Sequence, residues 1–204
     1  MTPISRRDFV ATAAAAGLAA PALSRFAPRV AGSDTLRVGL IGCGGRGTGA
    51  AVQALRGDKG TVLVAMADLF EDRMRSSLAG ITEAMEDQAS QKVQVKPDRM
   101  HVGFDAYEKV INSDVDVVLL TTTPNFRPQH IEAAVKAGKH IFAEKPMAVD
   151  APGVRKVLAA AAEAKRKNLA LVSGFCWRYG NAERAVFERI NAGDIGEVMA
   201  AHTT

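Results

Sequence analysis

Cysteine is scarce in this chain of 204 residues, with only Cys43 and Cys176 present. Two cysteines so far apart in the sequence exclude a disulfide-rich scaffold, and they do not have the spacing of metal ligands. We therefore predict no metal centre. We expect both thiols to be small buried side chains, because free cysteine is among the most buried residue types.

An excess of charge of one sign is also missing from most of the chain. The formal net charge is +4, but four of the 26 basic residues and only one of the 22 acidic residues precede Gly32. The rest is close to neutral, and no basic stripe with interleaved aromatic residues is present. These features remove the usual electrostatic argument for a nucleic-acid partner.

No apolar run near the N-terminus is long enough for a comfortable membrane span, which needs about 20 residues. Arg6 and Arg7 precede a short alanine-rich run at residues 9–23. Paired arginines before such a run resemble a twin-arginine signal peptide. The alternative is an ordinary amphipathic helix, but alanines on all sides would leave it no polar face.

The signal-peptide interpretation predicts a leader over residues 1–32 and a periplasmic or otherwise exported protein with no stable membrane anchor. Cleavage sites with small residues are present at 20–22 and at 30–32. The sequence does not choose between them.

From residue 36 on, short apolar runs alternate with longer amphipathic stretches. The runs are rich in Val, Ile and Leu without polar alternation, which is typical of parallel strands buried on both faces. They predict strands at residues 36–41, 61–67, 100–102, 115–120, 140–143 and 169–173. The stretches between them predict helices at residues 48–55, 71–88, 106–112, 128–136 and 151–167. Repeated strand–helix–strand units predict an α/β fold with a doubly wound parallel sheet, the Rossmann fold.

The ends of two predicted helices carry recognisable signals. Pro128 suits a first helical turn, and Gly138 follows the same helix where a positive φ is often needed. Asp150 is placed to cap the helix that begins at residue 151. These local signals agree with the strand and helix pattern.

The composition shifts after Gly174, where a further helix is predicted at residues 183–191 and a strand at 196–201. That strand would have no partner of its own within the chain. We therefore expect a fragment of a longer protein. Residues 33–175 would form an NAD(P)-binding Rossmann domain, and residues 176–204 the start of a second, truncated α+β substrate domain.

Gly42, Gly44 and Gly47 form a G-x-G-x-x-G motif directly after the first predicted strand. The first glycine permits a tight turn, the second lets the backbone approach a pyrophosphate, and the third lets helix and strand pack closely. Gly45 and Arg46 lie within the motif, where helix N-terminal amides face an anion. The alternative is a plain loop that happens to be rich in glycine.

Asp68 ends the next strand, 21 residues beyond Gly47. At that place a carboxylate can accept hydrogen bonds from the adenosine ribose hydroxyls. The alternative is a helix N-cap before Leu69. Because the carboxylate would repel a 2′-phosphate, we predict NAD as the cofactor; NADP stays open, since Arg46 or Arg73 could compensate.

Two more motifs follow the fourth and fifth predicted strands: Thr123-Pro124-Asn125 and Glu144-Lys145-Pro146. Together with the glycine motif they make residues 36–204 resemble the Gfo/Idh/MocA oxidoreductases. The resemblance implies that Lys145 is catalytic and exchanges a proton with a substrate oxygen. It also implies that Glu144 and Asn125 lie near the nicotinamide half, with Thr123 and Pro124 in the same cofactor site.

A lysine is chemically suited to that role. Removing a hydride from a carbinol requires a group that accepts the hydroxyl proton and stabilises the developing negative charge, and an amine at the carboxyl end of a strand can do both. The alternative for Lys145 is a solvated surface lysine.

The sequence departs from the family pattern at one place. Many members have a histidine shortly after the Pro-Asn pair, whereas this chain has Arg127 near that position. Arg127 either binds an acidic or hydroxylated substrate group or is a surface arginine. His130, inside the predicted helix, is expected to be structural.

The function predicted from these features is an NAD(P)-dependent oxidoreductase. It would transfer a hydride between the nicotinamide and a sugar, polyol or related carbinol, a small carbohydrate-like molecule. A homo-oligomer formed through the second domain stays open. One alternative is an NAD-dependent glycosidase of the same fold, but that branch tends not to keep a lysine like Lys145. Another is a dinucleotide-binding fragment without activity of its own.

Overall fold

The computed structural model of the chain describes residues 35–202. Residues 36–202 belong to one compact unit. The predicted signal peptide lies outside the described residues. Within the described part, no helix is both long and apolar enough to cross a membrane.

Six strands form a single sheet: β1 (Leu36–Ile41), β2 (Thr61–Asp68), β3 (Met100–Val102), β4 (Val117–Leu120), β5 (His140–Ala143) and β6 (Leu171–Ser173). Their order is β3-β2-β1-β4-β5-β6, and every neighbouring pair is parallel. The chain reverses its direction of winding between β1 and β4, the place where such sheets bind ligands. The predicted doubly wound Rossmann sheet is confirmed.

The helices follow the strands in alternation: α2 (Gly45–Gly57), α3 (Glu71–Met85), α4 (Ala89–Lys92), α5 (Ala106–Ile111), α6 (Arg127–Lys136), α7 (Ala151–Arg166) and α8 (Asn181–Asn191). Three short 3₁₀ turns complete them: η2 (Glu86–Gln88), η3 (Pro97–Arg99) and η4 (Cys176–Tyr179). The predicted helix at 71–88 thus ends at Met85 and continues as a tighter turn.

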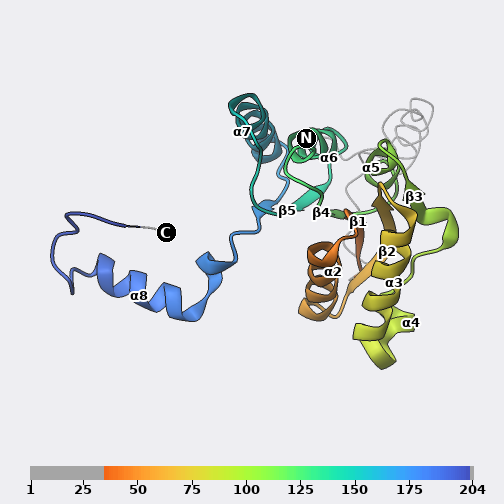
Figure 1. The fold of residues 1–204 in the computed structure, drawn as a ribbon, viewed down its shortest axis with the longest axis horizontal. Helices are drawn as coiled ribbons and strands as arrows, with labels where there is room; N and C mark the ends of the chain where they lie inside the picture. The colour runs from red at the N-terminus through yellow and green to blue at the C-terminus, as the bar shows by residue number, and fades with distance from the viewer. Residues whose placement is uncertain (1–34, 203–204) are drawn as a thin grey trace, which may run out of the picture. The chain divides into compact units, whose positions relative to one another are not determined.

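The helices cover both faces of the sheet, as Figure 1 shows, with α2 and α3 on one face and α5, α6 and α7 on the other. Leu55 and Ile81 pack on the first face, and Ile131 and Val157 on the second. Seven of the eight residues of β2 are buried, as expected for a parallel strand covered on both sides. Burial on both faces explains why the strands were readable as continuous apolar runs.

The predicted helix ends are confirmed. The Asp150 carboxylate accepts a hydrogen bond of 2.7 Å from the Gly153 N–H at the start of α7. Pro128 lies in the first turn of α6, and Gly138 beyond its end has a φ of 71°.

Two predictions are wrong. Residues 196–201 form no strand, because no neighbouring strand among residues 35–202 offers them hydrogen-bond partners. Cys176 is exposed, whereas Cys43 is buried as expected. Cys176 begins η4, a turn in which no residue is buried.

Candidate functional site

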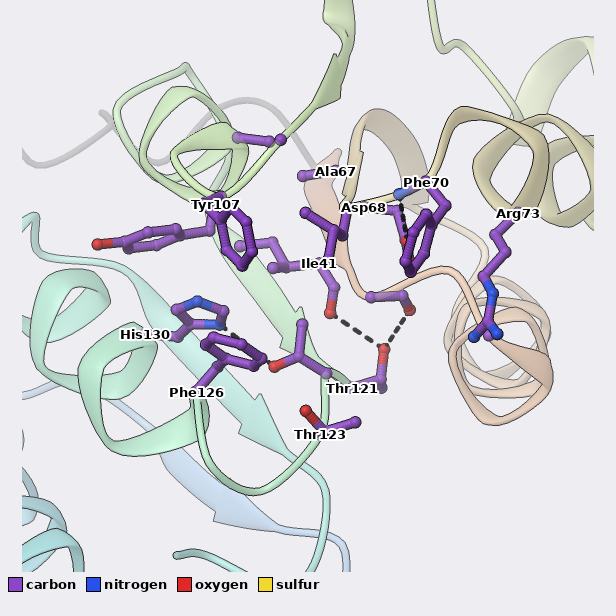
Figure 2. Close-up of a pocket in the computed structure, with 17 residues that line it drawn as sticks. Ile41, Ala67, Asp68, Phe70, Arg73, Tyr107, Thr121, Thr123, Phe126 and His130 are labelled. Atoms are coloured by element: carbon purple, nitrogen blue, oxygen red, sulfur yellow. Dashed lines mark hydrogen bonds between the residues drawn. The ribbon is translucent and has the colours of Figure 1, made fainter.

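The carboxyl ends of the central strands meet at one edge of the sheet, where a cavity of about 350 Å³ opens (Figure 2). Its lining comes from the loops after β1, β2, β3 and β4 and from helices α3, α5 and α6. Of the predicted site residues, the cavity brings together Gly42, Gly44, Asp68 and Thr123. The glycine motif and the carboxylate therefore share one site.

The positions of the loop require glycine for two different reasons. Gly42 has a φ of 97°, and a Cβ on Gly47 would lie 1.9 Å from the Gly42 carbonyl oxygen, so a side chain at either position would disturb the fold of the loop itself. A Cβ on Gly44 or Gly45 would meet no protein atom within 4 Å. The backbone at Gly44 is thus open for a ligand to approach.

The first turn of α2 favours an anion. Gly44 is the N-cap and supplies no side-chain cap, and the turn contains no acidic residue. The first amides of a helix have no intrahelical acceptor and carry the positive end of its dipole. These residues fit the pyrophosphate of a dinucleotide.

Asp68 connects the glycine loop to the end of β2. One carboxylate oxygen accepts from the Cys43 N–H at 2.6 Å, and the other accepts from the Phe70 N–H at 3.0 Å. The N-cap of α3 is Phe70, so the alternative of Asp68 as the helix cap is wrong. Each carboxylate oxygen keeps a further acceptor site for a ribose hydroxyl.

Cys43 beside this carboxylate has no sign of reactivity. Burial, and to a smaller extent the Asp68 charge, raise the pKa of its thiol. The thiol therefore stays protonated at neutral pH and acts as a packing group.

Aromatic side chains that sequence reasoning missed form part of the cavity wall. Phe70 and Phe104 line it although they remain 51% and 73% exposed, and the Arg73 guanidinium lies 5.4 Å from the centre of the Phe70 ring. Exposed aromatic rings beside a cavity can stack on a flat ring such as adenine. Phe70 follows β2 and Phe104 follows β3, and the two rings come to one cavity only because these loops meet in the folded structure. No local sequence signal indicates that the loops meet.

His130 lies on the opposite side of the cavity from Asp68 and Phe70 (Figure 2). Its ring stacks on Tyr107 with 4.2 Å between ring centres, and Nδ1 lies 3.2 Å from the Thr122 hydroxyl. Burial, followed by the charge of Arg127, lowers the pKa of His130 to about 4. The predicted structural role fits this neutral, packed ring, which also lines the cavity.

Thr121 ties β4 to the glycine loop. Its hydroxyl donates to the Gly42 carbonyl oxygen at 2.6 Å, with the Ile41 carbonyl oxygen at 3.1 Å (Figure 2). A Cβ on Gly47 would also lie 2.7 Å from this hydroxyl. The loop is therefore held from the neighbouring strand.

The carboxylate of Glu144 is buried at the end of β5 and holds two groups. The Arg46 Nε donates to it at 2.7 Å, and the Lys145 backbone N–H donates to its other oxygen at 3.2 Å. Arg46, predicted at the phosphates, is thereby joined to the Glu-Lys-Pro motif. The side chains of Asn125 and Lys145 are exposed at the same edge.

Arg127 is 2% exposed, so the surface interpretation is wrong. Its two terminal nitrogens donate to the carbonyl oxygens of Thr122 and Pro146. The substrate-binding interpretation is also wrong for this arrangement, because the guanidinium is enclosed and its terminal nitrogens are engaged. The residue belongs to the framework that carries the site.

A comparison with protein-family models matches residues 36–172 to the Gfo/Idh/MocA oxidoreductases, described as an oxidoreductase family with an NAD-binding Rossmann fold. The chain belongs to this family. The fold, the family and the nicotinamide cofactor predicted from the sequence are confirmed, the last by the NAD-binding character of the family.

Similar proteins agree with this assignment. Inositol 2-dehydrogenase 3 of Saccharopolyspora erythraea is 32% identical over 168 residues, which cover 82% of this chain and 44% of that protein. A glycosyl hydrolase family 109 protein of Solibacter usitatus is 29% identical over 212 residues, covering 97% of this chain and 45% of that protein. The crystal structure of an NAD binding oxidoreductase from Klebsiella pneumoniae superposes with a TM-score of 0.61 at 26% identity, covering 81% and 41% of the two chains. The chain thus spans a little under half the length of the curated relatives it matches.

Proposed function

We propose that the protein is an NAD(P)-dependent oxidoreductase that acts on a polyol, sugar or related carbinol, and that this chain supplies its dinucleotide-binding part. One observation carries the proposal. The open backbone at Gly44 and the Asp68 carboxylate line one cavity, and the Glu-Lys-Pro motif is joined to the glycine loop through the Arg46–Glu144 ion pair. The inositol dehydrogenase of S. erythraea supports the polyol class.

Each part of the site has a separate task in this proposal. Gly44, Gly45 and the first turn of α2 hold the pyrophosphate, and Asp68 binds the adenosine ribose. Thr123, Pro124, Asn125 and Glu144 lie toward the nicotinamide half, where bound NAD supplies a hydride acceptor or donor. NAD is preferred over NADP because Asp68 repels a 2′-phosphate.

Lys145 exchanges the proton of the substrate oxygen. Its side chain is exposed, and among residues 35–202 the structure gives its ammonium no ion pair, so the amine is available to a substrate. Its backbone N–H is bound to Glu144, whose carboxylate is in turn held by Arg46. The backbone is thus fixed while the amine is free to act as an acid or base.

An NAD-dependent glycosidase is the second candidate. The similarity to the Solibacter glycosyl hydrolase covers 97% of this chain, a larger share than the dehydrogenase match. Lys145 argues for the oxidoreductase, because the glycosidase branch tends to lack it.

Two further proposals concern the ends of the chain. We propose that residues 1–32 direct export through the twin-arginine route, supported by Arg6, Arg7 and the alanine-rich run. We also propose that residues 176–204 begin a substrate domain, supported by the seven large apolar side chains exposed from Trp177 to Met199. Loss of export of a folded reporter after Arg6→Lys with Arg7→Lys would support the first, and unchanged export would refute it.

The function is tested with the full-length protein, NAD and a panel of inositols, sugars and aryl glycosides. Formation of NADH, followed by its absorbance, is expected with a polyol or sugar. Release of the aryl group without net NADH formation would favour the glycosidase. Absence of NAD binding by calorimetry would refute both.

A further inference from the structure

Arg127 is buried at the start of α6 in a way that is energetically expensive. Its side chain is 2% exposed, and its Nε has no hydrogen-bond partner among the described residues. A buried charge costs several kcal/mol unless its interactions compensate. Its observed partners are two backbone carbonyl oxygens, those of Thr122 and Pro146.

These two carbonyls belong to the two loops that carry the predicted catalytic half of the site. Thr122 directly precedes the Thr-Pro-Asn motif after β4, and Pro146 directly follows Lys145 after β5. The β4–β5 ladder ends at the pair Leu120 and Ala143, followed by one bond of 3.0 Å from the Glu144 N–H to the Leu120 carbonyl oxygen. Beyond it, within residues 35–202, no backbone hydrogen bond joins the two loops.

Arginine is well suited to such a link. Its planar guanidinium presents several donors in a fixed fork and can bridge two acceptors at a set separation, whereas a lysine ammonium is a single point donor on a flexible stem. The Glu144 carboxylate accepts a hydrogen bond from the Arg46 Nε, and its negative charge also favours the charged form of the Arg127 guanidinium. The hydrogen bonds of the Arg127 fork go to the two loops and hold them together.

We propose that Arg127 is a positioning residue that clamps the Lys145 loop to the Asn125 loop and so places the Lys145 amine for proton transfer. The clamp itself rests on the hydrogen bonds above. Its consequence for turnover rests on the proposed function.

The chain offers a matched control at the other end of the sheet. Lys92 is a buried cation, 6% exposed, whose ammonium donates to the carbonyl oxygens of Asp58, Lys59 and Thr61 at the start of β2. Lys92→Met removes the same kind of interaction from a place that no part of the site touches. It controls for a general loss of stability.

The first test measures amide hydrogen exchange in this chain by mass spectrometry, with Arg127→Lys and Lys92→Met compared at equal distance from their melting temperatures. Losing a hydrogen bond to a charged group is expected to raise exchange roughly tenfold or more in segments 121–126 and 144–149 of the Arg127 variant. In the Lys92 variant the rise is confined to residues near 58–61. Equal exchange of segments 121–126 and 144–149 in the two variants would overturn the clamp.

The second test is a double-mutant cycle on turnover in the full-length protein. Misplacing the amine by an ångström is expected to lower kcat about 10- to 100-fold in Arg127→Lys, with the Kd for NAD changed less than about threefold. Adding Lys145→Met to Arg127→Lys should give no lower kcat than Lys145→Met alone, because both act through one amine. Additive losses would overturn the positioning role.

Two outcomes separate this inference from the proposed function. If the wild-type protein shows no turnover, the proposed function fails while hydrogen exchange still decides the clamp. If Arg127→Lys does not fold, Arg127→His, which retains one ring N–H donor, replaces it in both tests. Failure of both variants to unfold cooperatively would assign Arg127 to folding and overturn the positioning proposal.

Discussion

The two edges of the sheet use their polar side chains differently. At the amino-terminal edge, the Lys92 ammonium binds three carbonyl oxygens, and Lys139 donates to those of Ser113 and Val115, both at 2.8 Å. Asp114 at the same edge pairs with Arg37 and Arg99. The charged groups of this edge are engaged within the protein, the two lysines by backbone carbonyl oxygens and Asp114 by two arginines.

At the carboxyl-terminal edge, polar groups are held but keep capacity for a ligand. Asp68 accepts two backbone N–H groups, and Gly44 faces open space. The backbone of Lys145 is fixed through Glu144 while its side chain is exposed. The polar groups of the amino edge therefore stabilise the fold. Those of the carboxyl edge have a fixed backbone but keep unused hydrogen-bonding capacity, and this is the edge where parallel sheets bind ligands.

The largest effect that would break this comparison is expected at Lys145. In the full-length protein, Lys145→Met keeps the bulk of the stem but removes the amine, so kcat should fall by roughly two to four orders of magnitude, as for lost acid–base catalysis. The Kd for NAD, measured by calorimetry, should change little. Nearly intact turnover would place the proton relay elsewhere in the protein.

Gly44 and Gly47 sharpen the comparison within a single loop. Gly44→Val adds a side chain into space with no neighbouring protein atom and replaces the N-cap of α2 by a poorer one, so the melting temperature should fall by no more than about 2 to 4 °C while NAD affinity falls at least about 100-fold. Gly47→Ala should instead lower the melting temperature, because its Cβ would overlap the Gly42 carbonyl oxygen.

Thermal unfolding and NAD titration of both variants distinguish a dinucleotide cradle from a plain glycine-rich loop. In a plain loop, Gly44→Val would leave NAD affinity intact. That result would remove the central observation behind the proposed function.

His130 is a polar group of the carboxyl edge that we expect to contribute to stability and not to cofactor binding. Burial lowers the pKa of its folded state to about 4, below the ordinary value of 6.5. The unfolded chain therefore takes up the proton first, so the stability due to the neutral ring is complete above about pH 6.5 and is lost as the pH falls toward about 4. The full loss is about 3 kcal/mol.

Urea unfolding of wild type and His130→Gln at pH 7 and pH 4.5 measures this loss. The wild type should lose more unfolding free energy than the variant on acidification, since glutamine does not titrate. An equal loss in both proteins would show that protonation of His130 does not limit stability.

The sequence predicted the parts of the fold and site that depend on local pattern. Buried parallel strands are continuous apolar runs. The glycine motif directly follows β1 and Asp68 ends β2, so the topology alone brings them to one edge. The Arg46–Glu144 pair joins residues 98 positions apart, and no local signal marks it. The environment predicted for Arg127 is wrong because α6 begins at that residue and its side chain is buried, which depends on tertiary packing and not on local sequence.

The smallest expected effect concerns the choice between NAD and NADP at Asp68. Asp68→Ala removes both the ribose acceptor and the bonds to the Cys43 and Phe70 amides, so part of the loss strikes both cofactors equally. The NAD-specific part should be about 1 to 3 kcal/mol, the range for hydrogen bonds to a charged group.

Because the same change relieves repulsion of a 2′-phosphate, the ratio of the Kd for NAD to the Kd for NADP is the diagnostic quantity. It should shift toward NADP by roughly 5- to 150-fold in calorimetric titrations of this chain. Asp68→Asn, which keeps one carbonyl acceptor without the charge, should give an intermediate ratio. A ratio that stays constant across all three proteins would mean that Asp68 only fastens the loop to β2 and does not select the cofactor.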